Sequence, residues 1–141
     1  MKSVHLSALR ESGRRAAMVG LGTAAVVGLV SSPAQASSWM SSLSNAGPGF
    51  ESRRWYDTGG STTVEFTNCT SGSSVANVTL RKDVDFQVDP QYSTASFTNC
   101  FNGYNSTSSD SWDDHGSGNY YFAVNYGGWT YLTVRVVDVY Y

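Results

Sequence analysis

The sequence predicts an all-β protein, a small antiparallel β-sandwich of about seven strands with one disulfide bond, preceded by a signal peptide and an extended N-terminal arm. Three observations support this prediction. The N-terminus is basic and then apolar, the chain contains only two cysteines, and short runs rich in Val, Thr and aromatic residues alternate with turn residues. No segment after residue 36 has the pattern of a long helix.

The N-terminal segment has the layout of a secretory signal. Four basic residues lie within the first 15, and residues 16–30 carry no charge. This run is shorter than the roughly 20 residues of a membrane-spanning helix, and Pro33 ends it. Small side chains at Ala34 and Ala36 predict cleavage after Ala36, giving a signal peptide over residues 1–36. A retained membrane anchor is one alternative. Export by the twin-arginine route, which would use Arg14 and Arg15, is another.

Cleavage changes the charge of the chain. Residues 37–141 contain five Arg or Lys against ten Asp or Glu, a net charge of minus five. Such a surface repels phosphate backbones, so we expect no nucleic-acid partner. The signal peptide predicts a secreted, extracellular protein with no membrane attachment after cleavage.

Cys69 and Cys100 are the only cysteines, and an exported chain meets an oxidising environment. We therefore expect a disulfide bond between them, which would stabilise the fold by roughly 3 to 4 kcal/mol in the chain-entropy model. A pair of free thiols is the alternative. One histidine after residue 36 and two cysteines do not form a tetrahedral metal site, and we expect no metal or other cofactor.

Residues 37–50 read as a flexible arm, because they are rich in Ser, Gly and Asn and lack periodicity. Apolar side chains nevertheless recur along the arm, and as a docking arm it would bind a partner through Trp39, Met40, Leu43 and Phe50. The alternatives are that these side chains pack back on the domain or that the arm is a passive spacer.

Residues 51–141 form the predicted sandwich domain. Its expected strands are residues 52–57, 62–69, 75–82, 84–88, 94–100, 119–126 and 129–140, with a polar loop over 102–118. Alternation places three sets of side chains toward the core: Thr62, Val64 and Phe66; Ala76, Val78 and Leu80; Leu132, Val134 and Val136. Gly127 and Gly128 predict a tight hairpin between the last two strands.

The tetrapeptide Phe-Thr-Asn-Cys occurs twice, ending at Cys69 and at Cys100. In a regular strand, the period of two places Phe and Asn on one face and Thr and Cys on the other. We interpret the repeat as a local way of placing the disulfide.

Catalytic chemistry finds little support in the sequence. His115 is the only histidine after the signal, and it lies in a polar loop without a nucleophile motif, so we expect a protein that is not an enzyme. Asp residues cluster near positions 83–89 and 110–114. These clusters read as solubilising loops, and calcium binding is an alternative that the spacing leaves open.

Surplus aromatic residues indicate a binding surface, for a protein or for sugars that stack on rings. We expect Trp112 and Trp129 to be exposed near loops. Arg53, Arg54 and Trp55 combine two cations with an aromatic ring in a chain poor in positive charge, and they form a second candidate surface. A simple salt bridge of the arginines to Glu51 or Asp57 is the alternative.

After the Ser-rich arm, the chain shows a characteristic order of segments. They are GPGFESRRWYD, STTVEFTNC, VTLRKD, FTNC, GNYYFAVN and LTVRVVDVYY. This pattern resembles small exported β-sandwich proteins of actinomycetes, and among them the adaptor subunits of umbrella toxin particles. The resemblance implies an adaptor that links a repeat-containing toxin chain to a lectin subunit, with the arm inserted into the toxin chain. A carbohydrate-binding or cell-wall-binding module that uses Trp112 and Trp129 is the alternative function.

Overall fold

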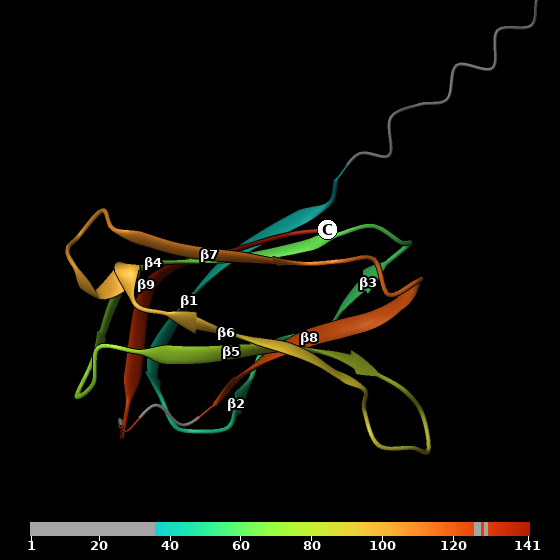
Figure 1. Cartoon of the computed structure of the whole chain (residues 1–141), viewed down its shortest axis with the longest axis horizontal. Coiled ribbons are helices and arrows are strands. Elements are labelled where there is room, and N and C mark those ends of the chain that lie inside the picture. Colours follow the sequence, from blue (N-terminus) through green and yellow to red (C-terminus); the bar gives the residue numbers. More distant parts are fainter. Residues whose placement is uncertain (1–35, 126–127, 129) are drawn as a thin grey trace, which may run out of the picture. The chain divides into compact units, whose positions relative to one another are not determined.

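The computed structural model describes residues 36–125, 128 and 130–141, and this part of the chain forms two packed antiparallel sheets (Figure 1). The predicted β-sandwich is confirmed, with nine strands rather than about seven. The signal-peptide prediction falls almost wholly on residues 1–35, outside the described residues. No helix among the described residues has the length and apolar character to cross a membrane.

The first sheet contains four strands. In spatial order they are β1 (Ser38–Ala46), β9 (Leu132–Tyr140), β4 (Thr62–Ser71) and β7 (Thr107–Trp112). Strands β9 and β4 lie in the middle of the sheet, and they carry much of the buried surface. Strands β1 and β7 lie at its two edges, so each has a neighbour on one side only among the described residues.

The second sheet packs against the first and lies below β4 and β7 in the view of Figure 1. Its strands are β2 (Phe50–Glu51), β3 (Trp55–Asp57), β8 (Gly118–Asn125), β5 (Ala76–Asp83) and β6 (Gln91–Phe97). Strands β2 and β3 pair one after the other along the same side of β8. The predicted strand over 52–57 is therefore shortened to β3, because residues 52–54 bend between the two strands. At this bend the hydroxyl of Ser52 accepts a hydrogen bond from the backbone N–H of Phe122.

Alternation predicted two of the core faces correctly. In β4 the side chains of Thr62, Val64 and Phe66 are buried, and in β5 those of Ala76, Val78 and Leu80 are buried. The ring of Phe66 meets those of Phe97 and Phe122 edge-on, with centroids 5.1 and 5.6 Å apart. Aromatic pairs at this spacing fill the space between the sheets.

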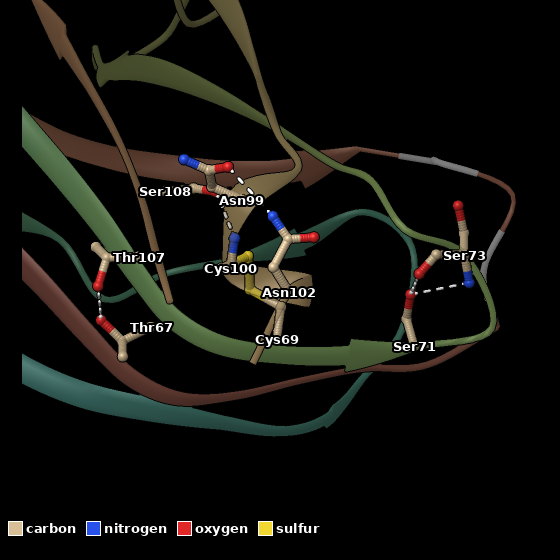
Figure 2. The surroundings of a disulfide bond; sticks show 9 residues. All are labelled: Thr67, Cys69, Ser71, Ser73, Asn99, Cys100, Asn102, Thr107 and Ser108. Carbon is tan, nitrogen blue, oxygen red and sulfur yellow. Dashed lines mark hydrogen bonds between the residues drawn. A yellow bond between two sulfur atoms is a disulfide. The ribbon is translucent and has the colours of Figure 1, made fainter. Parts of the chain in front are cut away.

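The disulfide between Cys69 and Cys100 is confirmed, with Cα atoms 5.0 Å apart (Figure 2). It joins β4 of the first sheet to η1 (Asn99–Phe101), a 3₁₀ helix that follows β6 of the second sheet. The backbone N–H of Cys100 donates to the hydroxyl of buried Ser108. The bond therefore ties the two layers together at one end of the sandwich.

The expected faces of the repeated tetrapeptide are wrong. Phe66 and Cys69 are both buried, because Asn68 between them adopts a left-handed conformation with φ of 56° and shifts the alternation by one residue. Strand β9 shows the same shift: Val137 is buried and Val136, expected in the core, is only half-buried. In the second copy, the chain turns into η1 before Cys100, so Phe97 and Cys100 are both buried as well.

The prediction of a flexible arm over residues 37–50 is also wrong. Residues 38–46 form strand β1 and pair with β9, and a second strand, β2, begins at Phe50. Leu43 and Ala46 are buried in the core. The apolar residues of this segment therefore stabilise it against the sandwich, which outweighs the low strand propensity of its serines.

Three further expectations are wrong. Residues 84–88 form a loop rather than a strand, and β7 lies inside the expected polar loop over 102–118. Cross-strand hydroxyl pairs, Thr67 with Thr107 and Thr63 with Ser111, stabilise β7, together with the buried ring of Trp112 at its end. The last two strands form no hairpin, because β8 and β9 belong to different sheets and their connection crosses between layers.

Candidate binding cleft at the open side of the sandwich

A small cleft of about 110 Å³ opens between the edge strand of the first sheet and the β2 edge of the second. Its lining is mostly apolar. The lining residues are Trp39, Ser41, Ser42, Leu43, Phe50, Ser52, Arg53, Phe122 and Val137. Four of the predicted partner-binding residues, Trp39, Leu43, Phe50 and Arg53, are thus brought together around one opening, which we call the β1–β2 cleft.

Trp39 forms the inner wall of the β1–β2 cleft. Its ring stacks on Phe122, with centroids 6.2 Å apart and an angle of 10° between planes, and lies 5.7 Å from the ring of Trp55. The indole Nε1 of Trp39 is buried and has no hydrogen-bond partner among the described residues. A buried donor without a partner is costly, so the packing of this ring on Phe122 and Trp55 outweighs the loss of a hydrogen bond at its N–H.

The strand beside the cleft is an unprotected sheet edge. Residues 38–46 read SWMSSLSNA, with no proline and no charged side chain. Natural edge strands usually carry such residues, because unpaired backbone groups otherwise pair with other chains. Met40, expected to be a docking anchor, is 73% exposed on this strand.

Arg53 and Arg54 have different roles. The Arg53 guanidinium lies 5.5 Å from the centre of the Trp39 ring and forms no ion pair with the described residues. The Arg54 guanidinium binds Glu51 and Asp83 at 2.9 and 3.2 Å and lies over the ring of Tyr121. Only Arg53 therefore presents an uncommitted cation at the cleft.

The expectation that the other tryptophans form a binding surface is wrong for two of them. Trp55 and Trp112 are both 3% exposed, and the indole N–H of Trp112 donates to the backbone carbonyl of Ser93. Large rings are needed to fill the narrow space between the sheets, and this requirement places them inside. Trp129 lies outside the described residues.

Polar side chains of the loops form contacts within the domain. Asp57 accepts a hydrogen bond from the backbone of Gly59, and Asp114 accepts one from Gly116. The ring of His115 stacks on that of Tyr92, with centroids 3.6 Å apart. Within the described ranges, no three His, Cys, Asp or Glu side chains lie close enough together to hold a metal ion.

Sequence reasoning missed the residues that complete the β1–β2 cleft. Phe122 and Val137 line it from the sandwich interior, and Ser52 lines it from the bend between β2 and β3. Phe122 and Val137 lie on strands that the sequence did predict. The signal that was missed is the apolar spacing of residues 38–46, which are the residues that bring the first sheet to this opening.

We find no family model, curated protein or solved structure that matches this chain.

Proposed function

We propose that the chain is an exported, non-enzymatic adaptor that takes up an extended segment of a partner protein at the β1–β2 cleft. The observation that carries this proposal is the combination of an unprotected sheet edge and an apolar cleft directly beside it. A partner strand added at β1 would supply main-chain hydrogen bonds, and one of its side chains would enter the cleft. In strand addition, the main-chain hydrogen bonds usually provide affinity and the side-chain pocket provides specificity.

The size of the cleft limits the side chain that it accepts. A cavity of about 150 Å³ holds a benzene molecule, so 110 Å³ suits a single aliphatic side chain such as Val or Leu. Arg53 at the rim favours a carboxylate next to that residue. The expected ligand is therefore an extended peptide with an aliphatic residue flanked by Asp or Glu.

Export is supported by the signal-like N-terminus and by the cystine, a bond that persists in oxidising compartments. Under the resemblance to umbrella particle adaptors, the partners are a large secreted toxin chain and a lectin subunit. The proposed mode of binding differs from an inserted arm, because Trp39 and Leu43 already pack inside the sandwich. A partner segment would come to the domain, rather than the arm to the partner.

The test uses the exported chain and fluorescein-labelled ten-residue peptides of alternating sequence, with a central Leu between two Asp residues. Fluorescence polarisation should detect binding to the wild-type chain. Ser41→Phe, which fills the cleft mouth, and Arg53→Glu, which reverses the rim charge, should both abolish it.

Two matched controls accompany these variants. Ser111→Phe places the same ring on β7, the opposite edge of the first sheet. Arg135→Glu reverses an arginine whose guanidinium contacts Tyr104 and does not line the cleft. Both controls should bind as the wild type does. Equal binding by Ser41→Phe and by its control would contradict the proposal.

A sugar-binding function is a second candidate, and a different hollow favours it. This hollow, at one end of the first sheet, has a volume of about 400 Å³. Its lining residues are Asn45, Thr70, Ser71, Gly72, Thr130, Tyr131 and Thr133. The ring of Tyr131 is 59% exposed there, beside hydroxyl and amide groups that can bind sugar hydroxyls.

Binding to immobilised cell-wall glycans separates the two functions. A sugar-binding domain should lose glycan binding in Tyr131→Ala and keep it in Tyr104→Ala, which removes an equally exposed ring from another loop. An adaptor without sugar affinity should bind no glycan in either form.

A further inference from the structure

The loop between β5 and β6 exposes two large apolar side chains. Phe86 is fully exposed and Val88 is 88% exposed. The loop extends beyond the strands at the lower right of Figure 1. Burying apolar side chains of this size stabilises a protein, and the fold itself leaves that contribution unused at both residues.

The backbone at Phe86 is strained. Its φ of 61° lies in the left-handed region, which is unusual and unfavourable for a bulky residue. Glycine or asparagine would fit this position better. Strain of this kind, held at a side chain that contacts solvent, is a feature of ligand-binding positions.

The base of the loop is fixed by a network of contacts. The carboxylate of Asp89 accepts hydrogen bonds from the backbone of Val84 at 3.1 Å and from the hydroxyl of Tyr121 at 2.6 Å. These bonds lower the pKa of Asp89, the one from Tyr121 most. Arg54 packs on the Tyr121 ring and binds Asp83 at the other end of the loop. The loop is therefore held in one shape before any partner arrives.

We infer that residues 84–88 form a preformed docking loop whose Phe86 and Val88 enter an apolar pocket of a second protein, bordered there by Lys or Arg. The charge of the loop supports this occupant. Of the three Asp in residues 83–89, Asp83 binds Arg54 and Asp89 accepts from Tyr121. Asp85, beside Phe86, forms no ion pair with the described residues, so its carboxylate is available to a Lys or Arg of the partner. This inference goes beyond the β1–β2 cleft and gives the adaptor a second site.

A lipid surface fits these observations less well. Aromatic residues that enter anionic bilayers are usually accompanied by Lys or Arg, and this loop carries acids. A fixed loop also costs less to order when it binds a preformed protein pocket.

The test places the photocrosslinking residue p-benzoylphenylalanine at position 86 of the exported chain, and at position 104 as a matched control. Tyr104 is also an exposed aromatic residue on a loop. The chains are irradiated in the secreted protein fraction of the native culture, and any adduct is mapped by mass spectrometry. Unlabelled wild type, Phe86→Asn and Asp89→Ala serve as competitors.

The inference predicts a discrete adduct from position 86 but not from position 104, mapped to an apolar segment next to Lys or Arg. Wild type should compete, while Phe86→Asn should compete about tenfold less well or worse. Asp89→Ala, which keeps the ring but releases the loop, should also compete less well. Phe86→Asn should melt at the same temperature as the wild type or higher, because asparagine accepts this backbone.

Four outcomes would overturn the inference. They are no adduct, adducts scattered over many proteins, equal competition by Phe86→Asn, and a lower melting temperature for Phe86→Asn, which would make the ring structural. A separate experiment uses vesicles of phosphatidylcholine with phosphatidylglycerol. Binding to these vesicles that depends on Phe86 would overturn the inference and assign the loop to a membrane. Peptide binding at the β1–β2 cleft is measured in a separate assay. The docking loop can therefore be disproved without disproving the cleft, and the cleft without the loop.

Discussion

Asn68 sets which side chains of β4 face the core. Its left-handed backbone shifts the alternation, so that Phe66 and Cys69 both point inward, and its backbone N–H donates to the carbonyl of Ser106. Asn68→Gly should therefore leave the free energy of unfolding nearly unchanged. Asn68→Ala should lower it by about 1 kcal/mol, since alanine tolerates this conformation poorly.

Urea unfolding of the two Asn68 variants measures this difference. Equal stability of the glycine and alanine variants would show that the conformation at Asn68 does not constrain the strand.

Tyr120 makes stability depend on pH in the alkaline range. Burial, then the neighbouring Tyr92 and the carboxylates of Asp57 and Asp114, raise the pKa of Tyr120 from 10.0 to about 12. The unfolded chain loses this proton near pH 10 and the folded chain near pH 12. Between these values the unfolded state binds fewer protons, so the free energy of unfolding should fall as pH rises.

Denaturant unfolding between about pH 9 and 11.5 checks the effect of Tyr120. Tyr120→Phe has no ionisable hydroxyl at this position, so its stability should fall less steeply over the same range. Parallel curves for the two proteins would contradict the assignment.

At the scale of elements, the disulfide links β4 to η1 across the two sheets, over a sequence separation of 31 residues. Replacing both Cys69 and Cys100 by Ala should lower the free energy of unfolding by about 3 to 4 kcal/mol, because the unfolded chain regains the freedom of that loop. Urea unfolding of the oxidised wild-type protein and of the double variant measures the loss. A change below about 1 kcal/mol would mean that the packed sheets alone fix this end of the sandwich.

Strand β1 is an integral part of the domain. It buries Leu43 and Ala46 and places Trp39 against Phe122. Deleting residues 37–50 should therefore destabilise the sandwich by several kcal/mol, since each large buried side chain contributes about 1.5 to 3 kcal/mol. Loss of binding after this deletion would not by itself identify a docking segment.

A gentler change separates stability from binding at β1. Met40→Lys should leave the melting temperature close to that of the wild type, because this side chain is exposed, yet it should prevent strand addition by placing a charge at the sheet edge. Circular dichroism and the labelled-peptide assay measure the two quantities. A stable variant that still binds the peptide would contradict strand addition at β1.

For the whole molecule, the sequence was informative where burial follows a simple period. Alternating Thr62, Val64 and Phe66 predicted β4, the two cysteines predicted the disulfide, and the overall spacing of strands predicted a sandwich. In these places local propensity and tertiary packing favour the same structure, so the local pattern predicts it correctly.

The rest depended on contacts that a local pattern does not contain. Residues 37–50 were read as an arm because serines separate the apolar residues of a strand whose partner, β9, lies far along the chain. Asn45, for example, donates a hydrogen bond to Thr133, 88 residues later. β7 has a polar sequence and is stabilised by hydroxyl pairs with β4. The cleft between β1 and β2 could not be predicted, because it exists only when edges of two different sheets meet.

The most direct measurement is hydrogen–deuterium exchange of the protein, alone and in the complex with an extended partner segment that the proposed function requires. The account predicts that the amides of residues 38–46 that point away from β9 exchange readily in the free protein and become protected in the complex, because a partner strand pairs with the open edge. Unchanged exchange over residues 38–46 in a stable complex would contradict it.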